Sequence, residues 1–286
     1  MERAEGTRGR SVYGLNVHGL DDVDELPAYD DTLPDQIPVH VRQVSEGPVP
    51  EPVPMTDRYG VWVMPSGRTF VADRDRGTAT YHGEPVPPDV LAHPYLAPVA
   101  TVFNRWAGRD TFHSGAFVHA GVAWAVIGPR TAGKSSLLAA LATRGVPVLS
   151  DDIVVLDAER VCVGPRCVDL RQPVPGVDPV RRTVRFGSRL RVPLPPAPAR
   201  TPLGGWLFLH WSDEVSMRQI PGPELLTRLA AARSWSWLTS DPTAVLGIAA
   251  LPAWDLGRPK DWSALDRTWR LLDGNLTAAR AAEIPA

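Results

Sequence analysis

Cysteine and long apolar runs are scarce in this sequence of 286 residues. Its two cysteines, Cys162 and Cys167, have no further sulfur or nearby histidine to complete a zinc site, so we expect two reduced, partly buried thiols. No apolar run approaches the ~20 residues that span a bilayer. The first ten residues are charged, with no apolar stretch behind them. We therefore expect a cytoplasmic protein with no membrane partner.

A large excess of charge of one sign is also missing. Lysine plus arginine total 30 and aspartate plus glutamate total 32, which gives a net charge of -2 and an isoelectric point near 6.4. Because no global positive field attracts polyanions, nucleic acid is not an expected partner. The length is enough for one large domain, or for one domain with an appended subdomain, and an enzyme of moderate size is the expected class.

The composition divides the chain into three parts. Residues 1–12 are charged and contain glycine, which predicts a disordered N-terminus. Residues 13–110 form a β-rich part, with a hairpin turn at 65–67 and one helix near 88–106, and we expect this part to pack on the core. Residues 111–286 form that core.

Strands and helices alternate in the core. The expected strands are 115–118, 122–127, 146–149, 153–156 and 205–210, and the expected helices are 134–144, 223–233 and 263–272. This order predicts an α/β fold in which a strand, a loop, a helix and a further strand bring functional groups to one sheet edge.

The stretch GPRTAGKSS, residues 128–136, follows the apolar strand at 122–127. Two glycines separated by four residues, then lysine and a hydroxyl residue, form the P-loop pattern, in which backbone N–H groups and a helix N-terminus face phosphates. Lys134 is expected to bridge the outer phosphates and Ser135 to bind Mg²⁺. The expected nucleotide-binding residues are Gly128, Arg130, Thr131, Ala132, Gly133, Lys134, Ser135 and Ser136.

Two adjacent carboxylates, Asp151 and Asp152, follow one short helix and one short strand after the P-loop pattern. The chain there returns to the sheet edge, at the carboxyl ends of parallel strands where ligands of open α/β sheets bind. One carboxylate at a phosphate site can coordinate Mg²⁺ while the other acts as general base. The residues alone leave open which of the two aspartates takes which role.

The stretch FVHAGVAWAVIGPRTAGKSSLLAALATRGVPVLSDDIVVLD resembles the catalytic core of the HPr kinase/phosphorylase family, and especially the shorter HPr-kinase-like proteins of bacterial peptide-modification clusters. The resemblance implies an HPr kinase/PEP carboxykinase-like P-loop core with a mixed, β-rich sheet, ATP and Mg²⁺ as cofactors, and a possible homo-oligomer. It also implies that Asp152 accepts the proton of the hydroxyl being phosphorylated, which leaves Asp151 with Ser135 as expected metal ligands, and that His119 takes the position of the family histidine.

The segment GPRCVDLR, residues 164–171, is similar to the place where that family has a Glu-Ile-Arg triplet. The resemblance implies that Asp169 helps hold the metal and that Arg171 faces the transferred phosphate. On physical grounds alone, an isolated histidine such as His119 is more often a core or strand-end residue, and His113 is a second candidate. Arg181, Arg182, Arg185, Arg189 and Arg191 form an arginine cluster that would suit either an oxyanion or a solvated loop.

These features favour an ATP-dependent phosphotransferase that acts on a serine or threonine hydroxyl of a small protein or precursor peptide. A small-molecule alcohol or amino acid is the next candidate acceptor. The same motifs would also suit a P-loop NTPase, or a nucleotide-binding regulatory module without phosphotransfer. No short signature separates ATP from GTP, so GTP stays open. Ser136 stands where the family has glutamate, which favours a substrate other than HPr.

Overall fold

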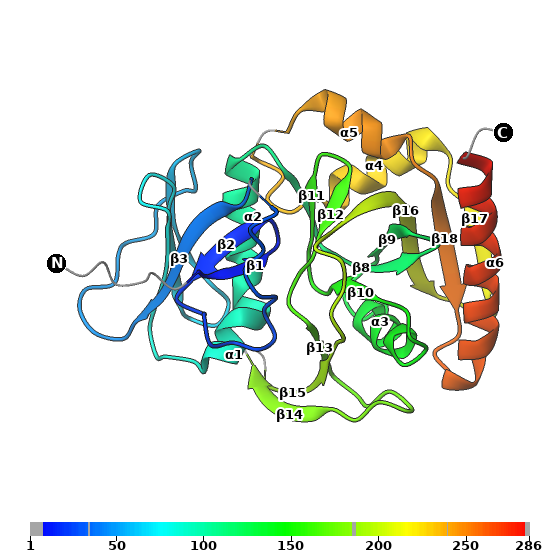
Figure 1. Cartoon of the computed structure of the whole chain (residues 1–286), viewed down its shortest axis with the longest axis horizontal. Coiled ribbons are helices and arrows are strands. Elements are labelled where there is room, and N and C mark those ends of the chain that lie inside the picture. Colours follow the sequence, from blue (N-terminus) through cyan, green and yellow to red (C-terminus); the bar gives the residue numbers. More distant parts are fainter. Residues whose placement is uncertain (1–7, 34, 185–186, 239, 284–286) are drawn as a thin grey trace.

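The structure, a computed structural model, describes residues 8–33, 35–184, 187–238 and 240–283. It is a mixed α/β fold, and the described strands form three sheets. Figure 1 shows the N-terminal sheet and the helix α2 on one side of the molecule and the larger core sheet on the other. Within the described ranges, no helix has both the length and the apolar character needed to cross a bilayer.

The N-terminal sheet has the strand order β1-β2-β3-β6-β5-β4. Its strands are β1 (Arg10–Val12), β2 (Leu15–His18), β3 (Ile37–Val44), β4 (Tyr59–Val63), β5 (Thr69–Asp73) and β6 (Thr78–His82). The strands β4 and β5 pair antiparallel, which confirms the hairpin with its turn at 65–67. Of the segment expected to be disordered, residues 1–7 lie outside the described residues, whereas β1 is ordered by pairing with β2.

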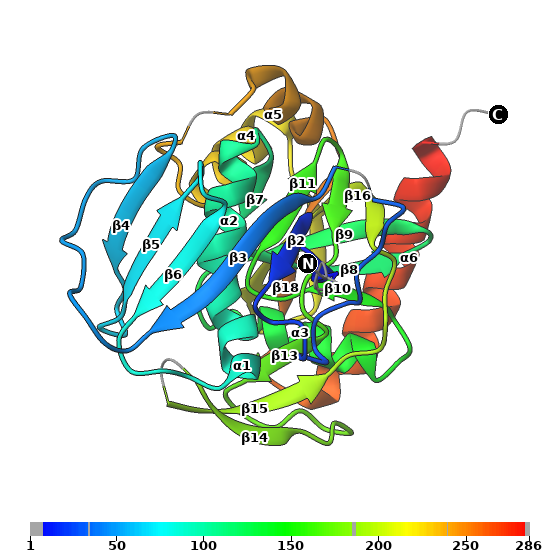
Figure 2. The same cartoon turned by 60° about the vertical axis from the view of Figure 1, so that its left-hand side comes forward.

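The helix expected near 88–106 is broken. It comprises α1 (Pro88–Val90), the π-helical segment η1 (Leu91–Tyr95) and α2 (Leu96–Trp106). His93 has non-helical backbone angles directly before Pro94, because proline lacks an N–H and clashes with the preceding turn. Apolar residues of α2 pack with those of the N-terminal sheet and with Ile153 and Val155 of the core. Figure 2 shows α2 beside the N-terminal sheet.

The core sheet has nine strands. They are β7 (Asp110–Phe112), β8 (Ser114–His119), β9 (Val122–Ile127), β10 (Val148–Ser150), β11 (Val154–Asp157), β12 (Arg160–Cys162), β16 (Arg200–Trp211), β17 (Ser216–Gln219) and β18 (Ala253–Arg258). The strand β16 pairs parallel with β9 and with β18, and β8 pairs antiparallel with both β9 and β10. Consequently β10, β9, β16 and β18 all end at the same sheet edge.

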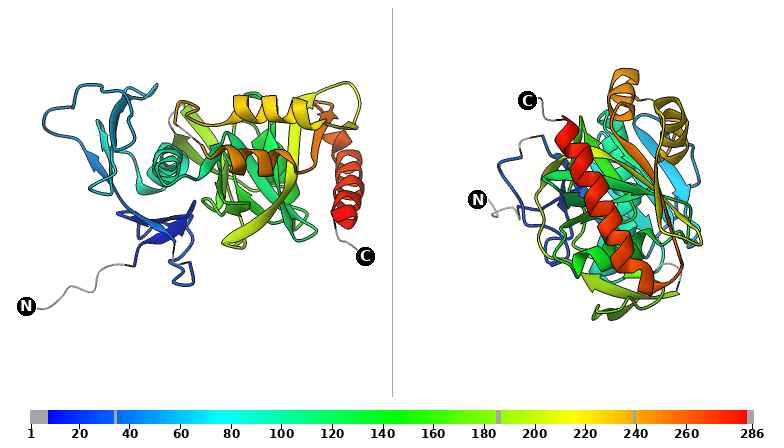
Figure 3. Two further views of the ribbon diagram at one scale, coloured as in Figure 1. Left: turned by 90° about the horizontal axis from the view of Figure 1, so that it is seen from above. Right: turned by 90° about the vertical axis from the view of Figure 1, so that its right-hand side faces the viewer.

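Helices cover both faces of the core sheet. They are α3 (Lys134–Ala142), α4 (Gly222–Ala232), α5 (Pro242–Ala249), the 3-10 turn η2 (Trp262–Ala264) and α6 (Leu265–Glu283). Along β9, alternate side chains pack with α3 and α6 on one face and with α4 and α5 on the other, as the period of two in a strand requires. Figure 3 shows α6 at the end of the molecule opposite the N-terminal sheet.

A small antiparallel sheet completes the fold. It consists of β13 (Cys167–Leu170), β14 (Val180–Val184) and β15 (Gly187–Pro193), in the order β13-β15-β14. Cys162 and Cys167 are both free and buried, and burial raises the pKa of each thiol. Because a thiol with a raised pKa is a poor nucleophile at neutral pH, these cysteines act as small core residues.

Candidate functional site

A cavity of about 740 Å³ lies at the edge where β9, β10, β16 and β18 end. Most of the residues expected to bind a nucleotide line it. These are Arg130, Thr131, Gly133, Lys134, Ser135 and Ser136; Gly128 and Ala132 belong to the same loop behind the lining. The expected catalytic and metal residues Asp151, Asp152, Asp169 and Arg171 line it as well. The fold therefore brings three separate sequence segments to one cavity.

The turn between β9 and α3, residues 128–133, forms a glycine loop. Gly133 has a φ of 84°, and a Cβ atom there would lie 2.3 Å from Nη2 of Arg258 and 2.9 Å from the ring of Trp211. A Cβ atom on Gly128 would lie 2.7 Å from the carbonyl oxygen of Leu209. Both positions thus require glycine, one for its backbone angle and both for the close approach of a neighbouring strand.

Lys134 is the first residue of α3 and is nearly buried. Its ammonium group donates a hydrogen bond of 2.7 Å to the carbonyl oxygen of Gly128 and contacts that of Pro129 at 3.4 Å. Burial lowers the pKa of Lys134, while the nearby Asp151 and Asp152 act in the opposite direction. The ammonium group of Lys134 therefore lies against the glycine loop, next to a helix N-terminus that favours anions.

The two adjacent aspartates have different environments. Asp151 is 2% exposed and accepts a 3.1 Å hydrogen bond from the hydroxyl of Ser135. Burial and the charge of Asp152 raise the pKa of Asp151 to about 7. The side chain of Asp152 is 36% exposed, and its φ of 71° turns the chain sharply after β10. One carboxylate is thus buried beside the α3 hydroxyl and the other faces the cavity.

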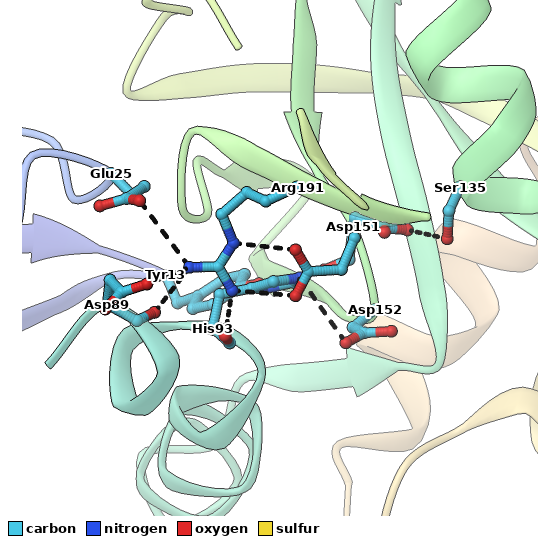
Figure 4. Close-up of polar contacts among 9 residues, drawn as sticks. Tyr13, Glu25, Asp89, His93, Ser135, Asp151, Asp152 and Arg191 are labelled. Atoms are coloured by element: carbon cyan, nitrogen blue, oxygen red, sulfur yellow. Dashed lines mark hydrogen bonds and ion pairs between the residues drawn. The ribbon is translucent and has the colours of Figure 1, made fainter. Parts of the chain in front are cut away.

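Asp169 is held in a buried ion pair with Arg191, and Figure 4 shows Arg191 between Glu25 and Asp89 on one side and Asp151 and Asp152 on the other. Nε and Nη2 of Arg191 donate to the two carboxylate oxygens at 2.8 and 2.9 Å. The same guanidinium donates to the carbonyl oxygens of Asp89 and His93 in the N-terminal part, at 2.9 and 2.6 Å. The charge of Asp169 is therefore already compensated, which makes it an anchor between the two parts of the chain.

His93 is a site residue that the sequence does not predict. Its Nε2 lies 3.8 Å from Asp169 and 4.0 Å from Asp152, and its side chain is 3% exposed. Tyr13, also from the N-terminal part, donates a 3.2 Å hydrogen bond to the backbone carbonyl of Asp151. Neither residue lies in a motif, and only the folded arrangement places them beside residues some 60 to 140 positions away.

His119 is not among the residues that line the cavity. Its Nε2 lies 3.1 Å from the hydroxyl of Thr277 and 3.4 Å from Asp273, both on α6. The reason is strand direction: β8 runs antiparallel to β9, so His119 pairs with Val122 at the sheet edge away from the glycine loop. The position of His119, outside the cavity lining, therefore does not support the catalytic role expected for it.

His113 occupies the position that was expected for His119. It directly precedes β8, whose first residue Ser114 pairs with Ile127, the last residue before the glycine loop. His113 consequently lines the cavity. The second histidine candidate of the sequence is thus the one that lies at the site.

Cations gather around the cavity. The sequence contains only two lysines, Lys134 and Lys260, and both line it. Arg130, Arg171, Arg189 and Arg258 line it too. Burial, followed by the neighbouring charges of Arg171 and Arg130, lowers the pKa of Arg189. Such a concentration of positive charge in a nearly neutral chain suits an anionic ligand. Of the arginine cluster, Arg185 lies outside the described residues.

Comparison with known proteins gives distant similarity alone. No family model matches the chain, and no curated protein matches it. Among solved structures, it is similar to the structure of the HPr(Ser) kinase/phosphatase from Coxiella burnetii, with 13% sequence identity and a TM-score of 0.33. That alignment covers 59% of this chain and 97% of the other. The chain is thus a distant structural neighbour of that enzyme.

Proposed function

We propose that the protein is a Mg²⁺- and nucleotide-dependent kinase with an HPr kinase/PEP carboxykinase-like P-loop core. It transfers the terminal phosphoryl group of ATP to a serine or threonine hydroxyl of a small protein or precursor peptide. The observation that carries the proposal is the meeting, in one cavity, of Lys134, the Ser135–Asp151 pair and Asp152.

The donor set at the start of α3 fits Mg²⁺. The hydroxyl of Ser135 and the carboxylate of Asp151 are adjacent hard oxygen ligands. The described residues contain no cluster of three or more His, Cys, Asp or Glu side chains arranged for a metal. Mg²⁺ usually binds one or two protein carboxylates and completes its shell with water and substrate phosphates, which the Ser135–Asp151 pair fits. Bound there, Mg²⁺ would neutralise phosphate charge.

In the proposed reaction, the glycine loop and Lys134 bind the phosphate chain, and Arg171 stabilises charge on the transferred group. Asp152, whose side chain is partly exposed to the cavity, accepts the proton of the acceptor hydroxyl. The hydroxyl oxygen bonds to the terminal phosphorus as the bond to the bridging oxygen of ADP breaks. Positioning and charge neutralisation supply the catalysis.

The acceptor is expected to reach the site from the side of Asp152. The carboxylate of Asp151 accepts a hydrogen bond from Ser135, and the carboxylate of Asp169 is paired with Arg191. Of these three aspartates, Asp152 is therefore the one whose carboxylate is open to an acceptor in the cavity. A peptide hydroxyl is the favoured acceptor because Arg189 adds a further cation to the cavity lining, beyond Arg171 and the glycine loop. A small alcohol is the second candidate acceptor.

Mass spectrometry for phosphate transfer tests the proposal. Wild type, Asp152→Asn and the control Asp213→Asn are each incubated with Mg-ATP and with panels of serine- and threonine-containing peptides and of small alcohols. Asp213 is exposed and is not among the residues that line the cavity. We expect wild type and Asp213→Asn to phosphorylate an acceptor, and Asp152→Asn to be slower by about 10²- to 10⁴-fold with unchanged nucleotide affinity. Full transfer by Asp152→Asn would show that another group takes the proton. ATP hydrolysis without phosphate transfer to any acceptor would instead indicate an NTPase. ATP binding without hydrolysis or transfer would indicate a regulatory module.

A further inference from the structure

Arg258, the last residue of β18, is a buried cation at the cavity. It is 5% exposed and its side chain is part of the cavity lining. Its Nη2 donates a 3.0 Å hydrogen bond to the carbonyl oxygen of Gly133, and its guanidinium carbon lies 4.4 Å from the ring centroid of Trp211. Its buried Nε has no hydrogen-bond partner within the part of the chain that the structure describes.

The other buried arginines show what is unusual about Arg258. Four arginines are buried among the described residues. Arg105 pairs with Asp110, Arg109 with Asp157, and Arg191 with Asp169. Across the same described ranges, no carboxylate forms an ion pair with Arg258, and its lowered pKa of about 10 has burial as its cause. The group therefore stays protonated at neutral pH.

A buried guanidinium without a negative partner is unfavourable. A carbonyl oxygen and an aromatic face compensate it only in part. Structural arginines avoid this penalty as the other three do, by pairing with aspartate. The fold keeps the charge of Arg258 in the lining of an open cavity, where an anionic ligand would supply the missing charge.

The position of Arg258 indicates that its anionic partner is the one bound by the glycine loop. It pairs across the strands with Trp211, the last residue of β16, so it lies at the edge where β9 leads into the glycine loop. Its hydrogen bond to Gly133 attaches it to the loop itself. An anion held by the glycine loop therefore lies next to this guanidinium.

We propose that Arg258 binds the phosphate chain of the nucleotide, as a cation supplied by β18 from outside the P-loop motif. The inference rests on the proposed function, because it assumes a nucleoside di- or triphosphate in the glycine loop. The fork of the guanidinium suits two phosphate oxygens, and binding relieves the unpaired charge of the free protein.

If Arg258 binds phosphate, removal of its charge weakens nucleotide binding but leaves the stability of the nucleotide-free protein unchanged or higher. Arg258→Met keeps a long apolar side chain against Trp211 and removes the charge. We expect Mg-ATP and Mg-ADP to bind it at least about tenfold more weakly, since a charge-assisted hydrogen bond contributes about 1.5 to 3 kcal/mol. The unfolding temperature of the nucleotide-free protein should stay the same or rise. Arg105→Met, which strands Asp110, serves as the matched control and should unfold at a clearly lower temperature.

Isothermal titration with Mg-ATP and Mg-ADP, together with thermal unfolding of the nucleotide-free proteins, tests the proposal. Wild-type affinity in Arg258→Met overturns it. So does a fall in unfolding temperature as large as that of Arg105→Met without a loss of affinity, because Arg258 would then only anchor the loop. A wild type that binds neither nucleotide overturns the proposed function itself, which makes the two failures distinguishable.

Arg258→Ala adds an independent measurement. Guanidinium ion, at a concentration too low to denature the protein, should restore Mg-ATP affinity to this variant if the charge does the binding. Failure of guanidinium to restore affinity, combined with a lowered unfolding temperature, would assign Arg258 a structural role and contradict the proposal.

Discussion

At the residue scale, two neighbouring aspartates have different environments. Asp151 is a buried part of the cavity lining, and burial and the charge of Asp152 raise its pKa to about 7, whereas the side chain of Asp152 is partly exposed. The sequence predicts that this pair stands at a phosphate site, because its spacing from Lys134 returns the chain to the same sheet edge. Which of the two is buried depends on the left-handed turn at Asp152, which no local pattern in the chain specifies.

The raised pKa of Asp151 predicts how stability depends on pH. The folded protein binds a proton more tightly at Asp151 than the unfolded chain does, so its free energy of unfolding falls as pH rises from 3.8, the ordinary pKa, toward about 7. The slope contributed by this group is at most about 1.4 kcal/mol per pH unit. We expect Asp151→Asn to remove it, so that the variant gains most in stability near pH 8.

Urea unfolding without divalent metal, at pH values between about 5 and 8, measures this effect. Asp213→Asn, at an exposed position, is the control. Asp157→Asn is unsuitable because it would also break the ion pairs of Asp157 with Arg109 and Arg200. A pH profile of Asp151→Asn parallel to that of wild type would show that Asp151 ionises normally.

At the element scale, the glycine loop acts through the strands that end around it. The sequence predicts the loop, the strand before it and the helix after it, and the structure confirms β9 and α3 in these places. The sequence does not predict that Trp211 and Arg258 pack against Gly133, because β16 and β18 come far later in the chain. The misplacement of His119 has a different origin: the two-residue connection between β8 and β9 requires an antiparallel hairpin, which places His119 at the end of β9 that lies away from the glycine loop.

Gly133→Ala tests the loop packing, and Gly121→Ala is its matched control. The two glycines have φ values of 84° and 78°, but a Cβ atom at Gly121 meets nothing within 4 Å. We expect Gly121→Ala to lose about 1 to 2 kcal/mol from backbone strain alone. Gly133→Ala should lose more stability, because its Cβ displaces Arg258 and Trp211, and should bind Mg-ATP at least about tenfold more weakly. Urea unfolding and calorimetry measure both, and equal behaviour of the two variants would contradict this packing.

At the scale of the whole molecule, the N-terminal part completes the site. Arg191 ties Asp89 and His93 of that part to Asp169 of the core, and Tyr13 contacts Asp151. The sequence predicts a β-rich segment before the core from its alternating residues, but not these contacts. The contacts of Arg191 with Asp89 and His93 span 102 and 98 positions, and hydrophobic periodicity carries no information about such polar pairs.

Arg191→Met tests this connection. Removing one partner of a buried ion pair leaves the other charge buried without compensation, so we expect a loss of about 3 to 5 kcal/mol in the free energy of unfolding. Arg182→Met is the comparison: Arg182 contacts the same Asp89 at 3.2 Å but is 40% exposed, and should lose less than about 1 kcal/mol. Urea unfolding distinguishes the two. A similar, small loss in both variants would mean that Arg191 does not hold the parts together.

The central claim is that the cavity binds a nucleotide through Lys134, and calorimetric titration of Mg-ATP into wild type and Lys134→Met tests it most directly. Methionine keeps the length of the side chain and removes the ammonium group. We expect saturable binding by wild type and affinity lower by at least about tenfold in the variant, which corresponds to about 1.4 kcal/mol or more. No binding by wild type, or equal affinity in a folded Lys134→Met protein, would contradict the account.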